Sequence, residues 1–270
     1  MSGFFERLAL IQESYDTLLC IGLDPDPQRF PAVIRQAPNP VFEFNRRIID
    51  ATADLVCCYK PQAAHYAALG AEAALEQTIN YIRDRHLPVV LDGKRGDVGS
   101  TAEKYAAEVF DRYGADAATI NPYLGLDAME PFLAREDKGL FVLCRTSNPG
   151  GRDLQELQLK DGSLLYEHVA EQAATRWNQH GNVGLVVGAT QPAELRRIRA
   201  ITGKMPFLVP GIGAQGGDLE ATLKAGAGGG MLISSSRAIL YAADDNTFAE
   251  AARAVAIATR DSINHYQSLL

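Results

Sequence analysis

Long apolar segments are missing from this sequence. No run approaches the ~18 apolar residues of a membrane span. The opening stretch MSGFFERLALIQESYDT holds acidic residues instead of the apolar core of a signal peptide. A net positive charge is also missing, because 26 lysines and arginines stand against 33 aspartates and glutamates and the formal net charge is −7. A broad nucleic-acid or membrane-surface partner needs a positive field and is disfavoured, although a few local cations would suffice for an anionic substrate. We expect a cytoplasmic protein.

Cysteine and histidine are few, and their spacing does not suit a metal site. The four cysteines form no C-x-x-C pair and stand inside apolar runs, where a free cysteine behaves as a small hydrophobic residue. The five histidines are scattered without ligand spacing. The sequence therefore predicts no disulfide framework, no zinc site and a reducing compartment. The cysteines are Cys20, Cys57, Cys58 and Cys144.

Short apolar runs recur along the chain, with helix-length segments between them. Most runs show no alternation with polar residues, which is typical of parallel strands covered on both faces. The eight runs span residues 18–23, 55–59, 88–91, 117–120, 139–144, 183–187, 206–209 and 230–233.

Amphipathic segments between these runs predict helices. Eight strands alternating with helices, without a break in composition, predict an α/β fold: a (β/α)8 TIM barrel forming a single domain over residues 1–270. A doubly wound open sheet is the alternative, but it usually has fewer strands. Ser100-Thr-Ala-Glu103 fits the capping box of a helix start. The predicted helices cover residues 42–54, 71–85, 101–113, 164–179, 193–201 and 248–263.

One predicted connection is unusually long. Residues 145–162 read RTSNPGGRDLQELQLKDG and are rich in turn-forming residues. A functional lid and a surface insertion both fit such a loop. The glycine run over residues 226–230 is most simply a tight helix-to-strand turn.

Charged residues gather where the predicted strands end. Lys60 ends the second strand, Asp92 and Lys94 end the third, and Asp97 follows on the turn into the next helix. Side chains alternate along a strand, so Asp92 and Lys94 should share a face and point into the barrel mouth, where Lys60 can join them. A structural ion-pair network is the alternative interpretation. Four charges of alternating sign at the reactive end of a barrel favour a functional site.

The loops after the last two predicted strands indicate a phosphate site. Pro210-Gly-Ile-Gly-Ala-Gln-Gly-Gly217 follows the seventh strand, and Ser234-Ser-Ser-Arg237 follows the eighth. Backbone N–H groups of a glycine-rich turn can approach phosphate oxygens, and Arg237 can bind them in a bidentate manner. Tight turns alone would explain the glycines. Glycine and arginine in the two loops that often bind phosphate in this fold favour a binding role.

These residues resemble one family. Leu91-Asp-Gly-Lys-Arg-Gly-Asp-Val-Gly-Ser-Thr101 resembles the D-x-K-x-x-D signature of orotidine 5′-monophosphate decarboxylases, continued by V-G-x-T. Because related sugar-phosphate enzymes share that signature, the further blocks discriminate better, and Cys144-Arg-Thr-Ser-Asn-Pro-Gly150 resembles the branch of larger bacterial enzymes. The other matching blocks, in order over nearly the whole chain, are Leu23-Asp24, Tyr59-Lys60-Pro61, Asn121-Pro-Tyr123, Val187-Gly-Ala-Thr190, Pro210-Gly-Ile212, Gln215-Gly-Gly-Asp218 and Arg237.

The resemblance implies loss of CO₂ from orotidine 5′-monophosphate to give UMP, the last step of pyrimidine nucleotide synthesis, without metal or organic cofactor. Lys94 would protonate the C6 carbanion, and Lys60, Asp92 and Asp97 would complete the charged array. Asp97 and Thr101 would reach into the partner subunit's site, which implies a homodimer.

The resemblance also implies the substrate contacts. Asp24 and Lys60 would hold the ribose, Ser147 the pyrimidine, and Gln215 and Arg237 the phosphate. Further residues expected at the substrate, from the matching blocks and the phosphate loops, are Asn121, Pro210 and Ser236. Ser236 stands where many relatives carry glycine, so we expect altered detail with phosphate binding retained.

Two other functions stay open. A sugar-phosphate aldolase or decarboxylase could use the same D-x-K-x-x-D strand, commonly with Mg²⁺ and a further carboxylate. A non-catalytic nucleotide-binding barrel would bind UMP without turnover, although each charged position of the array is present.

Overall fold

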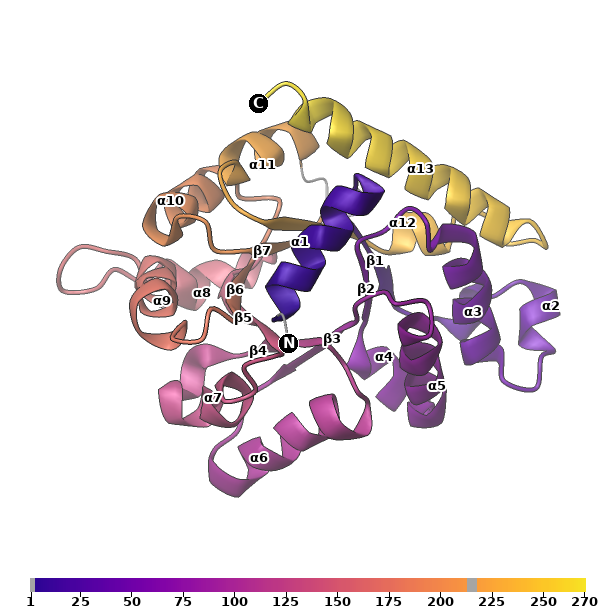
Figure 1. Cartoon of the computed structure of the whole chain (residues 1–270), viewed down its shortest axis with the longest axis horizontal. Coiled ribbons are helices and arrows are strands. Elements are labelled where there is room, and N and C mark those ends of the chain that lie inside the picture. The colour runs from indigo at the N-terminus through magenta and orange to yellow at the C-terminus, as the bar shows by residue number, and fades with distance from the viewer. Residues whose placement is uncertain (1–2, 213–217) are drawn as a thin grey trace.

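Eight parallel strands form a ring in the computed structural model, which describes residues 3–212 and 218–270 (Figure 1). The hydrogen-bonded order is β2-β1-β8-β7-β6-β5-β4-β3. Parallel bridges from Tyr59 to Val89 and from Gln62 to Asp92 join β2 to β3 and close the ring. The predicted barrel is confirmed. The strands are β1 Leu19–Leu23, β2 Cys58–Pro61, β3 Val90–Arg95, β4 Ala117–Ile120, β5 Gly139–Arg145, β6 Val183–Val187, β7 Phe207–Pro210 and β8 Met231–Ser235.

Helices surround the ring, and the six predicted ones are present. Two of them end in a π-helical turn, at Glu108–Arg112 and Ala173–Trp177. The helices are α1 Phe4–Tyr15, α2 Ala32–Arg35, α3 Pro40–Thr52, α4 Ala63–Ala67, α5 Glu72–Arg83, α6 Gly99–Ala107, α7 Leu126–Leu133, α8 Arg152–Gln155, α9 Leu165–Gln172, α10 Pro192–Thr202, α11 Leu219–Gly226, α12 Arg237–Leu240 and α13 Phe248–Gln267.

Two local predictions were wrong. The capping box at Ser100 does not form, because α6 begins two residues earlier than predicted, at Gly99. Its N-cap is Val98, which has no capping side-chain hydrogen bond. The second strand begins at Cys58 instead of residue 55. Residues 55–57 are buried, as strand residues would be. An apolar run in the sequence does not distinguish a buried segment that leads into a strand from the strand itself.

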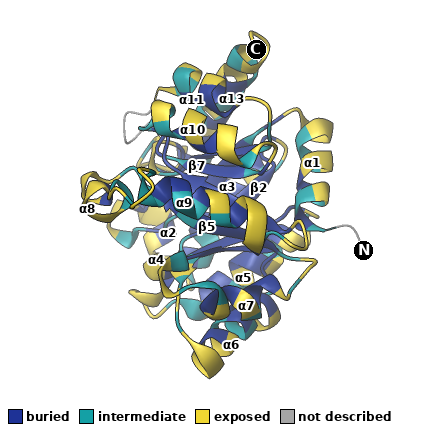
Figure 2. Ribbon diagram, turned by 90° about the vertical axis from the view of Figure 1, so that its left-hand side faces the viewer, coloured by how far each residue is buried: buried dark blue, intermediate teal, exposed yellow. Residues whose placement is uncertain are grey.

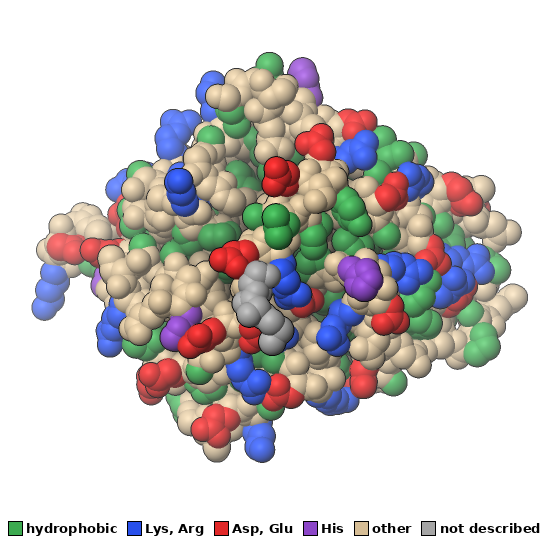
Figure 3. Space-filling view, viewed as in Figure 1, with side chains coloured by type: hydrophobic (Ala, Val, Ile, Leu, Met, Phe, Trp, Pro, Cys, Tyr) green, Lys and Arg blue, Asp and Glu red, His purple; other side chains and the backbone are tan. Residues whose placement is uncertain are grey.

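Helix α1 closes the amino-terminal end of the barrel, the end that faces the viewer in Figures 1 and 3. The Phe4 ring packs directly over Gly139, where a Cβ would collide with it, and lies edge-on to Phe141 with centroids 6.2 Å apart. Acidic and basic side chains are interspersed on this face (Figure 3). One buried residue from each strand completes the layer above Phe4: Cys20, Cys58, Val90, Ala117, Phe141, Val186, Leu208 and Leu232.

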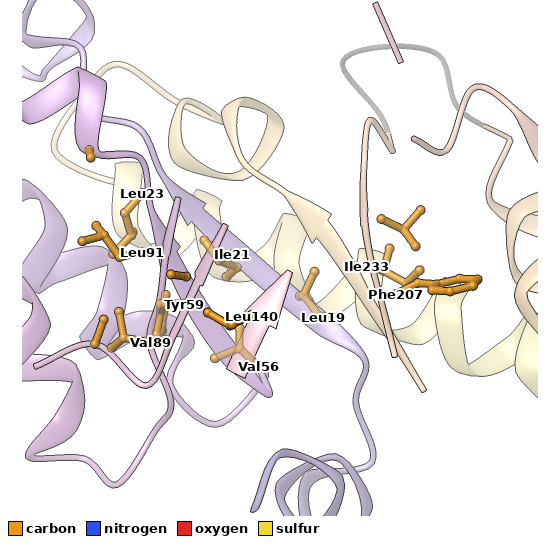
Figure 4. Close-up of a cluster of buried hydrophobic side chains, with 14 of the residues drawn as sticks. Leu19, Ile21, Leu23, Val56, Tyr59, Val89, Leu91, Leu140, Phe207 and Ile233 are labelled. Carbon is orange, nitrogen blue, oxygen red and sulfur yellow. The ribbon is translucent and has the colours of Figure 1, made fainter. Parts of the chain in front are cut away.

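A second and larger core lies between the strands and the helices. Figure 2 shows the strands buried at the centre of the molecule, and Figure 4 shows Leu19, Ile21, Tyr59 and Leu91 among the apolar side chains that fill this layer. The two cores together bury both faces of every strand, which explains why the strand sequences lack polar alternation.

The glycine run before β8 surrounds a buried arginine. Arg199 of α10 donates hydrogen bonds to the backbone carbonyls of Gly226, Gly203, Met205 and Gly230. A Cβ at Gly229 would collide with its guanidinium group. The sequence predicted only a tight turn here. The missing side chains of the run also leave room for the Arg199 guanidinium group, whose hydrogen bonds join α10 to the segment before β8.

Candidate active site

The mouth of the barrel is lined by residues two positions beyond the apolar layer. Lys60, Asp92 and Thr119 follow Cys58, Val90 and Ala117 on adjacent strands, so alternation along each strand turns them inward. They lie at the carboxyl ends of the strands, opposite the end that α1 covers, where barrel enzymes hold their reactive groups.

Asp92 is the centre of this cluster. Its Oδ2 lies 2.9 Å from Lys60 Nζ, and its Oδ1 lies 2.6 Å from Lys94 Nζ. Thr119 Oγ1 donates a further hydrogen bond of 2.7 Å to the same Oδ1. Asp92 and Lys60 are buried, whereas the Lys94 side chain is 43% exposed. The cluster thus offers one ammonium group to a ligand and keeps the other pair of charges fixed beneath it.

The two buried charges hold one another ionised. Burial alone would raise the pKa of Asp92, but the ammonium groups of Lys60 and Lys94 outweigh that effect and hold this pKa well below its usual value. Burial would likewise lower the pKa of Lys60, and the carboxylates of Asp92 and Asp24 outweigh it and raise this pKa. Both groups therefore stay charged throughout the neutral range.

Lys94 reaches Asp92 through an unusual backbone conformation. Its φ is +46°, in the left-handed region that side chains other than glycine seldom adopt. Its N–H donates to Thr119 Oγ1 at 3.0 Å, and the register between β3 and β4 shifts between Leu91 and Arg95. Regular strand alternation, on which the prediction depended, therefore does not continue to Lys94. Thr119, which sequence reasoning missed, binds both the backbone of Lys94 and the carboxylate of Asp92.

In the described residues, no hydrogen bond or ion pair joins Asp97 or Thr101 to this cluster. The Asp97 carboxylate accepts a hydrogen bond of 2.8 Å from the backbone N–H of Val98. Thr101 is exposed on α6. The structure therefore brings together three of the four predicted charges, and Asp97 is not among them.

A second group of predicted residues meets where β1 and β8 end. Ser236 Oγ donates a hydrogen bond of 2.5 Å to Asp24 Oδ2. Arg237 is exposed at the first position of α12, and Pro210 lies beside Ser234 in the register of β7 and β8. Gln215 lies outside the described residues.

The remaining predicted residues follow β4 and β5. Asn121 is exposed, and its Oδ1 accepts a hydrogen bond from Tyr123 N at 3.0 Å, so this oxygen caps the local turn. Ser147 is partly buried, close to Gly188, where a Cβ would lie 2.8 Å from Ser147 N. That close approach seats the Ser147 backbone against the end of β6.

Arg145, the last residue of β5, holds the long loop that follows. Its side chain is fully buried and donates to the carbonyl of Thr146 at 2.8 Å and to the Glu156 carboxylate at 2.5 Å. Gln155 Oε1 accepts from the backbone N–H of Thr146 at 2.9 Å. These contacts fasten α8, visible at the left edge of Figure 2, to the end of β5.

The outer part of the same loop extends into solvent. A bridge between Gln158 and Leu164 narrows it to a small hairpin. Leu154 and Leu157 are each 50% exposed. Both interpretations made from the sequence, a lid and a surface insertion, remain compatible with a loop that is anchored at one end and projects at the other.

Metal-ligand clusters and membrane-spanning helices are both absent from the described part of the chain. There, no three His, Cys, Asp or Glu side chains converge in a way that could hold a metal ion, and no helix is long and apolar enough to cross a membrane. The four cysteines are free and buried.

Comparison with known proteins identifies the family. The profile described as "Orotidine 5′-phosphate decarboxylase / HUMPS family" matches residues 17–252. The chain belongs to the orotidine 5′-phosphate decarboxylase family. A protein of that name from Azoarcus sp. (strain BH72) is 59% identical over 269 residues, which cover 98% of this chain and 99% of the relative. Another from Janthinobacterium sp. (strain Marseille) is 57% identical over 268 residues.

Solved structures of the orotidine 5′-phosphate decarboxylase family share the fold. The OMP decarboxylase of Leishmania donovani superposes with a TM-score of 0.84 at 42% identity, and the match covers 98% of each chain. Both full-length relatives named above carry the decarboxylase name. The sequence-based assignment to this family of carboxy-lyases is therefore confirmed.

Proposed function

We propose that Lys94 delivers the proton to C6 in the reaction of this family, the decarboxylation of orotidine 5′-monophosphate to UMP. Membership of the family supports the reaction. The observation that carries the mechanism is the buried Asp92 carboxylate between the ammonium groups of Lys60 and Lys94. No other cluster in the described residues combines fixed charge of both signs with an exposed proton donor at the barrel mouth.

The charges suit each stage of the reaction. A substrate carboxylate bound beside Asp92 is repelled by it, and the repulsion disappears as CO₂ leaves. The C6–carboxyl bond breaks, its electron pair stays on C6, and Lys94 Nζ gives that carbon a proton. Because the C6 charge exists only along the reaction path, an adjacent ammonium group lowers the barrier more than it tightens substrate binding. Solvent then returns a proton to Lys94.

The residues around the charged array bind the other parts of the nucleotide. Asp24 and Lys60 bind the ribose, Ser147 the pyrimidine, and Arg237 with Gln215 the phosphate. Asn121, Pro210 and Ser236 complete the binding surface. The phosphate lies far from the bond that breaks, so its binding energy holds the base against the array and contributes to closing the loops.

A second subunit supplies the missing charge. Asp97 bonds only locally in the described chain, and the exposed apolar residues Val98, Tyr123 and Leu124 occupy the adjacent loops after β3 and β4. A pairing that covers these three side chains would carry Asp97 and Thr101 to the partner's site. We infer a homodimer that works in the cytoplasm, where the four free cysteines remain reduced.

The proton-donor role is tested with Lys94→Ala. We expect turnover of orotidine 5′-monophosphate, followed by its absorbance, to fall at least about a hundredfold, as for loss of a general acid that also stabilises charge. UMP should still bind, and the exposed-lysine control Lys224→Ala should behave as the wild type. Unimpaired turnover by Lys94→Ala would show that Lys94 is not the proton donor.

Metal dependence separates the reaction from its main rival. We expect the wild type to retain full turnover in EDTA, whereas a sugar-phosphate enzyme that needs Mg²⁺ would lose activity. UMP binding by a wild type without turnover would instead identify a non-catalytic nucleotide-binding barrel.

A further inference from the structure

Ser236 lies between two residues to which the proposal gives different contacts, Asp24 at the ribose and Arg237 at the phosphate. It lies between β8, which ends at Ser235, and α12, which begins at Arg237. Strands β1 and β8 are neighbours, with Ile21 paired to Ser235, so Ser236 falls beside Gly22. A Cβ at Gly22 would lie only 2.8 Å from the Cβ of Ser236. Glycine at position 22 therefore leaves space for the serine side chain to approach β1.

The Ser236 hydroxyl uses that space to reach Asp24. Ser236 Oγ donates to Asp24 Oδ2 at 2.5 Å. The other carboxylate oxygen, Oδ1, is buried, and it receives no hydrogen bond from the described part of the chain. One carboxylate oxygen of Asp24 is thus held by a donor, while the other has no hydrogen-bond donor in the described part of the chain. A buried charged acceptor in this condition is costly unless a ligand donates to it.

The backbone around Asp24 is also held. Tyr241 OH donates to the Asp24 carbonyl at 2.9 Å and accepts from Asp26 N at 2.7 Å. With the main chain fixed in this way, the orientation of the carboxylate depends on its own side-chain torsions. The Ser236 hydroxyl supplies a side-chain hydrogen bond that restrains these torsions.

We infer that Ser236 is a positioning residue that directs Asp24 Oδ1 toward a sugar hydroxyl of the bound nucleotide. This inference depends on the proposed function, because it concerns the ribose half of the same site. Since Ser236 precedes Arg237, it links recognition of the sugar to the segment that binds the phosphate. A carboxylate with one oxygen occupied by serine is left to accept from one sugar hydroxyl at Oδ1, so the contact distinguishes ribose from a deoxy sugar.

The test measures the binding of UMP, 2′-deoxy-UMP and 3′-deoxy-UMP to the wild type, Ser236→Ala and Ser236→Thr. We expect Ser236→Ala to weaken UMP binding about tenfold, the effect of one hydrogen bond to a charged group. One deoxy analogue lacks the hydroxyl that donates to Asp24, and its affinity should fall less than about twofold on the same substitution. Ser236→Thr keeps the donor and should restore most of the affinity for UMP. Ser262→Ala, on the exposed surface of α13, is the control.

The outcomes separate the possible failures. Equal losses for all three ligands would assign Ser236 to phosphate binding or packing and overturn the inference, as would no loss at all. A wild type that does not bind UMP would overturn the proposed function itself. Ser236→Gly provides a second variant, because it removes the hydroxyl and relieves the close approach to Gly22; we expect it to reproduce the ligand-dependent loss of Ser236→Ala.

Discussion

At the scale of single residues, the Asp92 carboxylate compensates the buried positive charge of Lys60. Lys60 is buried beside it and has a raised pKa that depends on nearby carboxylates. Removal of one partner from a buried ion pair leaves an uncompensated charge, which costs far more than the intact pair contributes. Asp92 therefore serves stability as well as chemistry.

Asp92→Asn should lower the free energy of unfolding by about 3–5 kcal/mol at neutral pH, measured by urea denaturation. The folded-state pKa of Asp92 is depressed, so its contribution is complete above the unfolded pKa of about 4 and is lost as the pH falls through the lower folded value. The gap between the wild type and the variant should therefore narrow on acidification. Asp261→Asn, at an exposed ion pair, should change little. A variant as stable as the wild type at pH 7 would contradict this account.

At the scale of elements, the loop after β5 is ordered by a single buried cation. Arg145 bonds to Thr146 and Glu156, and Gly151 packs so tightly that a Cβ there would lie 2.7 Å from the Arg145 guanidinium. Ser147, which we assign to the pyrimidine, lies two residues beyond Arg145. On this assignment, the position of the base depends on Arg145, which is placed outside the substrate contacts.

Arg145→Lys should raise the KM for orotidine 5′-monophosphate about tenfold, because lysine cannot reproduce the forked hydrogen bonds that fix the loop. kcat should change less, since the array on β3 is intact. Residues 152–162 should also become more sensitive to protease. Arg152→Ala, whose side chain is 69% exposed on the same loop, is the matched control. An unchanged KM together with unchanged proteolysis would show that Arg145 does not position this loop.

Local sequence patterns predicted the elements better than the contacts between them. Buried parallel strands produce continuous apolar runs, and charges at their ends mark the mouth, so Lys60 and Asp92 could be located in advance. The left-handed conformation of Lys94 depends on Thr119, a residue from the next strand, and the glycines of residues 226–230 depend on Arg199 from another helix. Such constraints join distant segments, and periodicity in a single sequence does not reveal them.

At the scale of the whole molecule, our proposal requires a second copy of the chain to complete the site. In the described residues no hydrogen bond or ion pair joins Asp97 to Asp92 or Lys94, while Val98, Tyr123 and Leu124 expose apolar surface in the loops after β3 and β4. Exposed apolar groups gathered in one region indicate a contact with another protein. A second copy of this chain would cover them and supply a carboxylate at the same time.

Tyr123→Glu should therefore convert the dimer to a monomer in sedimentation experiments and reduce turnover. The Tyr123 side chain is 77% exposed, so a charge there should not disturb the fold of the single chain. Leu10→Glu, 61% exposed on α1 at the opposite end of the barrel, should leave the dimer intact. A dimeric Tyr123→Glu protein with normal turnover would place the interface elsewhere.

The most direct test of the complete array mixes two inactive variants, Lys94→Ala and Asp97→Ala, after dissociation and reassociation. Each alone lacks one member of every site. Random pairing gives mixed dimers in which one site carries both substitutions and the other carries neither, so about a quarter of the sites become native. We predict recovery of about a quarter of wild-type turnover. If mixed dimers form and no activity returns, Lys94 and Asp97 do not meet across the interface and the shared site is wrong.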